Sequence, residues 1–381
     1  MIPLTQIKAE LANMWHEVTR SSVLTLVAYT ESADRATQIS DLLDRLAGQH
    51  PSRAITIVVE STNATPTASV MLHTHEIGQT KNMIGAEQIV IYLPVTEMAR
   101  VAEYVQPLLL SDMPVFVWWA GQLPGNERLI EDLSGLGDHL VFDSAVFAQP
   151  SRDLTILADL IRQYRSSKVN YKAYHDFNWE RLTPWRAAIS QSFDPPHLEY
   201  LEHISQARIG YVGHADLLAP STQAYLLVGW LAALLDWTPE SFQIQPSGGA
   251  QCLVRSPRRA APISIEIAPF AVTHTPVSAI PPTAPVSHPI ILEGALLFVE
   301  LIAEVNGAQI LFRTALSDDG TKSVSSVMHL DGERALPRTM PMEVQDEVML
   351  LAGQLTRIRY DHIYEDAVLS AQAIIAAKRG G

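Results

Sequence analysis

The sequence of 381 residues contains a single cysteine, Cys252. One cysteine excludes an intramolecular disulfide and every CxxC redox or zinc motif, because each of these needs at least two thiols. Without a disulfide framework to indicate an oxidising compartment, we expect a reduced, cytoplasmic protein. Cys252 lies in an apolar stretch with only Arg255 nearby. We therefore interpret it as a buried, inert thiol and not as a nucleophile.

Long apolar segments and an excess of basic residues are also missing. The longest apolar stretches, such as residues 225–235, are too short to cross a bilayer. The first 18 residues mix charged side chains with apolar ones at helical spacing, which is unlike a signal peptide. Lys and Arg number 27 against 41 Asp and Glu, a net charge of −14. Since nucleic acids and anionic lipids bind through local excesses of Lys and Arg, we expect neither as a partner.

The usual motifs of nucleotide-binding and catalytic sites do not occur. There is no GxxxxGK[ST] phosphate loop and no GxSxG nucleophile elbow. The first expected strand, residues 22–30, runs into ESADRA, which lacks the glycines that bring backbone N–H groups close to a pyrophosphate. His73 and His75 share one strand face beside Glu76, but no neighbour supplies the third ligand that a zinc site needs. We expect no catalytic residue, no metal and no cofactor.

Hydrophobic patterns divide the chain into two expected domains. In residues 1–170 amphipathic helices alternate with continuous apolar runs, among them SVLTLVAYT, RAITIVVE, AEQIVIYLP and PVFVWW. This alternation predicts an α/β domain with a mainly parallel sheet covered by helices on both faces. Residues 171–381 contain helices, then short strands, then two helices near 342–356 and 361–377. Together with hairpin turns such as Asn306-Gly307, they predict an α+β domain with an antiparallel sheet.

One aromatic and basic cluster lies in MPVFVWWAGQLPG, residues 113–125, together with Arg53 at the start of an earlier strand. Successive side chains of a strand point to opposite faces, so Trp118 and Trp119 cannot serve one purpose. We expect one tryptophan to pack under a helix. The other should face a crevice at the carboxyl end of the sheet, where ligands of open α/β sheets bind. The assignment stays open, with Trp119 preferred as the outer residue because it is nearer the strand's end.

A second cluster lies in DFNWERLTPWR, residues 176–186, around a helix start with Thr183 as the expected N-cap and Pro184 at the first helical position. Trp and Arg often anchor protein interfaces, and the N–H groups of a helix start attract anions. Packing between the two domains is the other explanation, and the residue types alone favour it, with the tryptophans buried between the domains and the arginines bonded to carbonyl groups. The residues that surround this helix start are Trp179, Arg181, Trp185 and Arg186.

These segments in combination resemble the glucose-6-phosphate dehydrogenase assembly protein family, OpcA. The stretches SVLTLVAYT, HPSRAI, EQIVIYLP, PLLLSDMPVFVWWAGQLP and DFNWERLTPWR follow one another between residues 20 and 200. The resemblance implies a non-catalytic partner that binds glucose-6-phosphate dehydrogenase and promotes its active oligomeric form. Redox control through cysteine pairs, proposed for cyanobacterial members, cannot operate within a chain that has Cys252 alone. The candidate contacts to the partner or a ligand are Arg53, Trp118, Trp119, Trp179, Arg181, Trp185 and Arg186.

One alternative function stays open at this point. The chain could be an enzyme or sensor that binds a sugar phosphate or nucleotide in a crevice between the domains. In that case Arg53, Arg181 and Arg186 would grip the phosphate, since guanidinium groups bind phosphate through paired hydrogen bonds.

Overall fold

The computed structural model describes residues 1–14, 19–20, 22–60, 65–77, 82–125, 127–166, 171–213, 220–270, 293–317, 322–329, 338–342, 345–357 and 360–377. The chain divides into two compact units. Unit 1 consists of residues 1–146, 160–177 and 346–361, and unit 2 of residues 147–159, 178–345 and 362–381. Each unit is assembled from three separate segments of the chain. A single boundary at residue 170 therefore does not describe these units, and the expected domain division stays a prediction.

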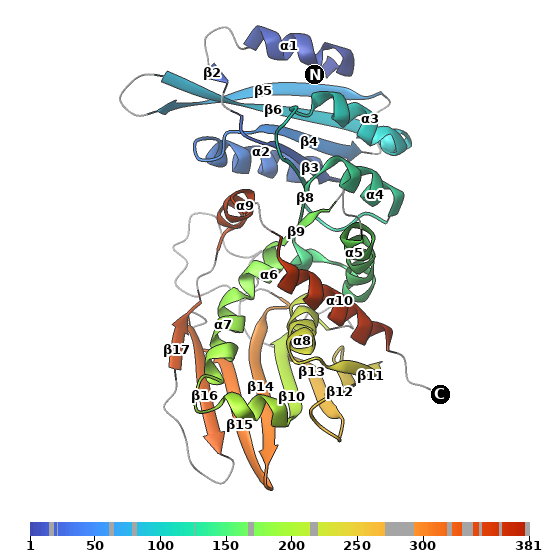
Figure 1. The fold of residues 1–381 in the computed structure, drawn as a ribbon. Helices are drawn as coiled ribbons and strands as arrows, with labels where there is room; N and C mark the ends of the chain where they lie inside the picture. Colours follow the sequence, from blue (N-terminus) through green and yellow to red (C-terminus); the bar gives the residue numbers. More distant parts are fainter. Residues whose placement is uncertain are drawn as a thin grey trace. The chain divides into compact units, whose positions relative to one another are not determined.

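Unit 1 contains a mainly parallel sheet, as the sequence predicts (Figure 1). In the described residues it has nine strands in the order β1-β5-β6-β4-β3-β7-β8-β9, with β2 beside β6. Every residue of β3 and of β7 is buried, which explains why these strands are continuous apolar runs. Among the described strands only β5 runs in the opposite direction, since it is antiparallel to both of its neighbours, β1 and β6. The strands are β1 (Ile2–Pro3), β2 (Thr19–Arg20), β3 (Thr25–Thr30), β4 (Arg53–Glu60), β5 (Thr67–Ile77), β6 (Asn82–Pro94), β7 (Val115–Trp119), β8 (His139–Phe142) and β9 (Ala173–Asp176).

The order of the parallel strands identifies the place where a ligand would be expected. Numbered along the chain, β3, β4, β6, β7, β8 and β9 lie in the order 3-2-1-4-5-6, which is that of doubly wound dinucleotide-binding sheets. The order reverses between β3 and β7, so the switch point lies at the carboxyl ends of these two strands. Because Tyr29 lies opposite Trp119 in the register, the chain that follows Trp119 begins beside the turn after β3.

Helices α2 (Ala33–Ala47) and α9 (Glu347–Leu355) cover one face of this sheet. Helix α2 is capped by Ser32, whose side chain accepts a hydrogen bond from the backbone N–H of Arg35. The helix expected near residues 342–356 is present as α9, but its position in unit 1 was not predicted. The other α-helices that contribute to unit 1 are α1 (Ile7–Met14), α3 (Val101–Val105), α4 (Glu127–Leu136) and part of α5 (Pro150–Arg165).

Unit 2 contains a largely antiparallel sheet of eight strands in the described residues, in the order β11-β12-β13-β10-β14-β15-β16-β17. Only the pair β10 and β13 is parallel. Asn306 and Gly307 both have positive φ, 53° and 83°, which confirms the predicted hairpin turn. The strands are β10 (Ile204–Val212), β11 (Thr238–Ile244), β12 (Ala250–Arg255), β13 (Ile263–Phe270), β14 (Leu296–Val305), β15 (Ala308–Leu316), β16 (Lys322–His329) and β17 (Arg338–Pro341).

The helices of unit 2 lie on one face of its sheet (Figure 1). Helix α7 (Thr183–Ser192) packs on β15 and β16, and α8 (Thr222–Leu234) packs on β10. Helix α10 (His362–Ala376) packs on α8 so closely that a Cβ at Gly229 would lie 2.1 Å from the backbone oxygen of Ala367. The short helix α6 (Phe177–Arg181) precedes α7, and all its residues except Phe177 belong to unit 2.

Candidate partner-contact site

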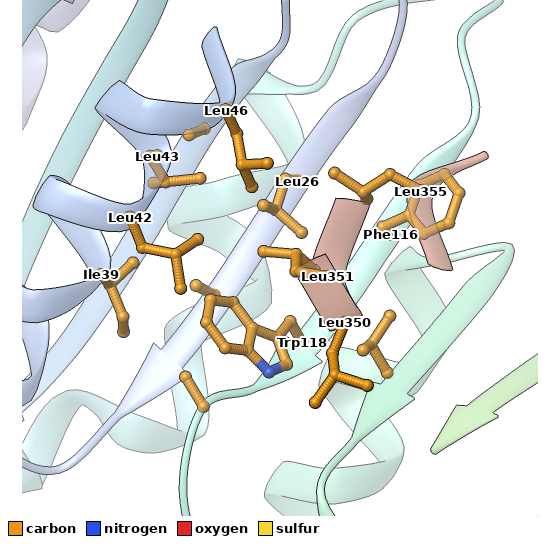
Figure 2. Packing of buried hydrophobic residues seen from close by; sticks show 14 of the residues in the cluster. Leu26, Ile39, Leu42, Leu43, Leu46, Phe116, Trp118, Leu350, Leu351 and Leu355 are labelled. Atoms are coloured by element: carbon orange, nitrogen blue, oxygen red, sulfur yellow. The ribbon is translucent and has the colours of Figure 1, made fainter. Parts of the chain in front are cut away.

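Trp118 lies in the core beneath α2 and α9 (Figure 2). Its side chain is 0 % exposed, and its ring centre lies 6.1 Å from that of Phe177. The guanidinium carbon of Arg35 lies 5.7 Å from the ring centre, which is within the range of a cation–π contact. Leu350 and Leu351 of α9 belong to the same apolar cluster. Trp118 is therefore the tryptophan that the sequence expects under a helix.

Trp119 lies on the opposite face of β7, but it is also buried. Its side chain is 1 % exposed and stacks on Phe142, with ring centres 5.0 Å apart and planes at 7°. Val117 lies on the same face of β7 as Trp119. Gly137, the residue directly after α4, lies close to it, since a Cβ added to Gly137 would be 2.6 Å from the Val117 side chain. The α4 side of the sheet therefore covers Trp119. The expectation that Trp119 faces an open crevice is wrong, because both faces of a doubly wound sheet are covered.

Neither indole N–H has a hydrogen-bond partner among the described residues. Burial of an unpaired N–H costs about 1–3 kcal/mol. The two tryptophans therefore stabilise unit 1 through their buried apolar area and ring contacts. The cost of burying the two indole N–H groups offsets part of this stabilisation. This is core packing, and whether either residue also contacts a partner stays a prediction.

Arg35 fills the switch point between β3 and β7. Its Nε donates to the backbone oxygen of Ala120 at 3.0 Å, and the N–H of Ala120 donates to the oxygen of Tyr29 at 3.0 Å. At the end of β3, the hydroxyl of Thr30 accepts from the N–H of Ser32 at 3.2 Å. Both backbone polar groups of Ala120 are thus used by the chain itself, at the point where a dinucleotide site offers N–H groups to a pyrophosphate.

Helix α9 completes this arrangement from the other end of the chain. Arg35 also donates to the carboxylate of Glu347, at the start of α9. Asp346 caps α9 by accepting from the N–H of Met349 at 2.8 Å, and it forms an ion pair of 3.0 Å with Arg45 of α2. The hydrogen bond from Met349, together with Arg45, lowers the pKa of the Asp346 carboxyl. The ion pairs with Arg35 and Arg45 therefore connect the start of α9 to α2, while the cap stabilises α9 itself.

Arg53 lies at the first residue of β4, the amino end of a parallel strand. It is therefore at the end of the sheet opposite the switch point, since the carboxyl ends of parallel strands share one edge. Its side chain is buried, forms an ion pair with Glu87 and donates to the backbone oxygen of Leu108 at 2.8 Å. These contacts give Arg53 a structural role, and its contact with a partner or ligand stays a prediction.

The second cluster forms a stack in unit 2. The guanidinium carbon of Arg186 lies 3.3 Å from the ring centre of Trp179, whose ring centre is 5.5 Å from that of Tyr364 in α10. Trp179 and Trp185 are both buried, whereas Arg181 and Arg186 are half-buried. This arrangement brings Trp179 and Arg186 together and ties α6 and α7 to α10.

The expected helix start at Thr183 is different in the structure. Helix α7 begins at Thr183 itself, and the preceding residue, Leu182, has helical geometry without a side-chain cap. The oxygen of Leu182 accepts from the N–H of Arg186 at 2.9 Å, and the N–H of Leu182 donates to Asn178 at 3.2 Å. The hydroxyl of Thr183 instead accepts from the Arg186 guanidinium at 2.9 Å. Since α7 follows α6 almost without a break, the expected cap and anion site at Thr183 are not formed.

Sequence reasoning missed a buried chain of polar groups that connects β8, β9 and α9. His139 Nδ1 lies 3.0 Å from His175 Nε2, and His175 Nδ1 lies 3.1 Å from Gln354 Oε1. The Gln354 oxygen is an acceptor, so His175 donates from Nδ1 and, when neutral, accepts from His139 at Nε2. Burial, with the neighbouring His139, lowers the pKa of His175 to about 4. No sequence motif marks this chain, because its members belong to three elements.

The remaining candidates have structural explanations. His73 Nδ1 lies 2.8 Å from Asp44 Oδ1 and its Nε2 lies 2.7 Å from Gln88 Oε1, while the side chain of His75 is outside the described residues. Burial raises the pKa of the Cys252 thiol to about 12, which favours an inert thiol. Within the described ranges there is no group of three or more His, Cys, Asp or Glu placed to hold a metal ion. In the same ranges, no helix has the length and apolar character needed to span a membrane.

Fold and site together define a two-domain protein whose first domain keeps a dinucleotide-binding strand order but fills the switch point with its own side chains. The chain belongs to the OpcA family. The family domain described as "Glucose-6-phosphate dehydrogenase subunit N-terminal domain" matches residues 43–159. The companion family domain, described as the C-terminal domain of the same glucose-6-phosphate dehydrogenase subunit, matches residues 172–368. This confirms the resemblance seen in the sequence.

Relatives in other organisms share part of their length with this chain. A Synechocystis protein provisionally named OxPP cycle protein OpcA is 29 % identical over 212 residues, which are 54 % of this chain and 42 % of that protein. A protein of the same provisional name from Synechococcus elongatus is 26 % identical over 332 residues, 85 % of this chain and 67 % of the relative. This chain therefore spans less than half of the first relative and about two thirds of the second.

Solved structures with a distant likeness are oxidoreductases. KijD10, a 3-ketoreductase from Actinomadura kijaniata, has 9 % identity and a TM-score of 0.47, with 94 % of this chain and 98 % of that chain covered. An oxidoreductase from Sinorhizobium meliloti has 10 % identity and a TM-score of 0.43, with 93 % and 89 % covered. TM-scores this low do not support a comparison of function.

Proposed function

We propose that this protein is a non-catalytic, cytoplasmic partner that binds glucose-6-phosphate dehydrogenase and promotes its active oligomeric form. The observation that carries the proposal is the family match over both domains, since both family descriptions name a subunit of this dehydrogenase. The names of the relatives agree with a role in the oxidative pentose phosphate pathway.

The geometry of the switch point supports the non-catalytic part of the proposal. A dinucleotide site in this fold needs glycines after the first strand and backbone N–H groups directed at the phosphates. Here the turn after β3 is Glu31-Ser32, and the Arg35 side chain spans the switch point to Ala120 and Glu347. A cofactor at this place would have to displace these contacts.

The alternative, an enzyme or sensor that grips a phosphate with arginines, loses support from the position of Arg53. Its guanidinium is buried and bonded to Glu87 and to the Leu108 carbonyl. Removing such a guanidinium from a buried carboxylate costs several kcal/mol, which a phosphate contact would have to offset.

Among the candidate contacts, the half-buried arginines of α6 and α7 are the ones that keep accessible surface. We assign the contact with the dehydrogenase to Arg181 and Arg186, since both are half-buried and Arg is among the residues that most often anchor protein interfaces. Trp179 and Trp185 support them from the core of unit 2. In this assignment Arg53, Trp118 and Trp119 contribute by stabilising unit 1.

The test mixes the purified protein with the dehydrogenase of the same organism and measures mass by light scattering and initial rate together. We expect a complex at micromolar concentration and a rate that rises until the partner is saturated. Arg181→Ala should weaken the complex by roughly 30-fold, the effect of an interface anchor worth about 2 kcal/mol. Arg128→Ala, on an exposed position of α4, is the matched control and should bind normally.

Two results would contradict the proposal. One is the absence of any complex and of any change in rate at about 10 µM of both proteins. This concentration is well above the Kd of a specific interface. The other is calorimetric binding of NADP at micromolar concentration by the protein alone, which would favour the enzyme or sensor.

A further inference from the structure

Among the described residues, the helices of unit 2 leave one face of its sheet uncovered. Helices α7, α8 and α10 pack on the other face (Figure 1). Burial alternates along β12, where Cys252 and Val254 are buried while Gln251, Leu253 and Arg255 are exposed. Strand β13 alternates in the same way. We call the exposed side, formed mainly by β12, β13, β10, β14 and β15, the open face.

A row of alternating charges crosses the open face. Its members, in the order β13, β10, β14 and β15, are Glu266, Arg208, Glu300 and Arg313. They are direct neighbours in the strand register. Arg208 Nε lies 3.2 Å from Glu266 Oε2, its NH1 lies 3.2 Å from Glu300 Oε2, and Arg313 also pairs with Glu300. Three of the four side chains are between 40 % and 48 % exposed.

Apolar residues flank this row on both sides. Phe298 lies across Gly210, since a Cβ on that glycine would be 2.2 Å from the ring. The guanidinium carbon of Arg313 lies 5.1 Å from the centre of the same ring. On the other side, Ile302 and Leu311 are half-buried neighbours in the register. The side chains of Phe298 and Arg313 therefore lie close to the sheet. The open face combines apolar and charged groups, as protein interfaces do.

We propose that the open face binds a second copy of this chain in a two-fold symmetric dimer. Consider a two-fold axis that runs parallel to the strands between β10 and β14. The rotation reverses the row, so Arg208 faces Glu300 of the second copy and Glu266 faces Arg313 of the second copy. Every charge then meets an opposite charge. The alternative axis, along the row, would place each charge against itself, which is repulsive.

The size of the open face is in the range of small specific interfaces. Its five strands, spaced about 4.8 Å apart, form a face roughly 24 Å wide, and about seven residues per strand give roughly 23 Å of length. The resulting area, on the order of 550 Å² per copy, is about two thirds of the roughly 800 Å² that each partner contributes to a standard interface, which is the size of the smaller, transient interfaces. Two sheets stacked with their strands nearly aligned are also a common packing arrangement.

Sedimentation velocity on the full chain tests the proposal through a pair of charge reversals. We expect the wild-type chain to be a dimer at micromolar concentration. Glu266→Arg alone places two arginines against each other at both copies of this contact, and Arg313→Glu alone places two glutamates there, so each variant should dissociate at least about tenfold more readily. An equimolar mixture of the two variants restores opposite charges at both contacts and should form the heterodimer.

The mixing step separates this geometry from a general loss of stability, because a misfolded variant would not regain a dimer on mixing. Arg128→Glu, outside the face, is the charge-matched control and should remain dimeric. A wild-type monomer at about 50 µM would overturn the proposal, as would a failure of the mixture to dimerise. If the wild type is monomeric and Glu266→Arg loses binding to the dehydrogenase, the face belongs to that partner instead. The inference goes beyond the proposed function, and the sedimentation measurements on the wild type and the variants contain no dehydrogenase, so each proposal can fail without the other.

Discussion

Replacing Trp118 with alanine should lower the free energy of unfolding of unit 1 by about 3–5 kcal/mol, the range for deleting a large buried aromatic side chain. The value follows from its position, fully buried among α2, α9 and Phe177, where loss of the indole leaves a cavity. In a domain of roughly 150–250 residues, this corresponds to a fall in Tm of roughly 6–20 °C. Trp119→Ala should have a similar effect from the α4 side.

The corresponding phenylalanine variant is the sharper test. Trp118→Phe removes part of the ring but also removes an N–H without a partner in the described residues. The two effects oppose each other, so this change should cost less than about 2 kcal/mol. Urea unfolding followed by circular dichroism measures each variant, and Val95→Ala, at an exposed position, is the control.

Two results would refute this reasoning. If Trp118→Ala melts within about 2 °C of the wild type, Trp118 is not a core residue. If Trp118→Phe costs as much as Trp118→Ala, the N–H makes a hydrogen bond that the packing argument omits.

Three further predictions concern the polar interactions of unit 1. Arg53→Met leaves Glu87 buried without its ion pair and should cost about 3–5 kcal/mol in urea unfolding, whereas Arg53→Lys should cost less. Folding lowers the pKa of His175 from 6.5 to about 4. As the pH falls, the unfolded chain therefore binds a proton at His175 before the folded chain does. Stability should therefore fall as the pH falls from about 6.5 to about 4, by on the order of 3 kcal/mol, and melting curves of His175→Gln should lack this part of the pH dependence. A double-mutant cycle of Arg35→Ala and Glu347→Ala should give a coupling of about 0.5–1 kcal/mol, and an additive result would contradict the attachment of α9 through this pair.

Local patterns predicted much of the fold. The apolar runs of β3, β4 and β7 are buried on both faces, which is why they indicate a parallel sheet. The Asn306-Gly307 turn was also predictable, since two consecutive positive φ values favour these residue types. Strand β9 was missed because its sequence, AYHD, contains two polar residues. Their hydrogen bonds to His139 and Ser144 make burial possible, and these partners are distant in the sequence.

The candidate site shows the same limit. Its residue types were evident, because four of the seven tryptophans lie in the two segments 113–125 and 176–186. Their exposure was not, since alternation along β7 places Trp118 and Trp119 on opposite faces without indicating what covers each face. The open face was not predicted either. The alternation of β12 is visible in its sequence, but the order of charges in the row depends on which strands become neighbours.

By itself, the sequence determined the two classes of sheet, the family, and the lack of a phosphate-binding turn, because each depends on residues that are close together in the chain. Only the tertiary structure decided that α9 packs against α2 and that Glu347 pairs with Arg35 at the switch point. These two residues are separated by 312 positions. Contacts across such a separation form only when the complete fold brings the chain segments together, so no local periodicity could have indicated them.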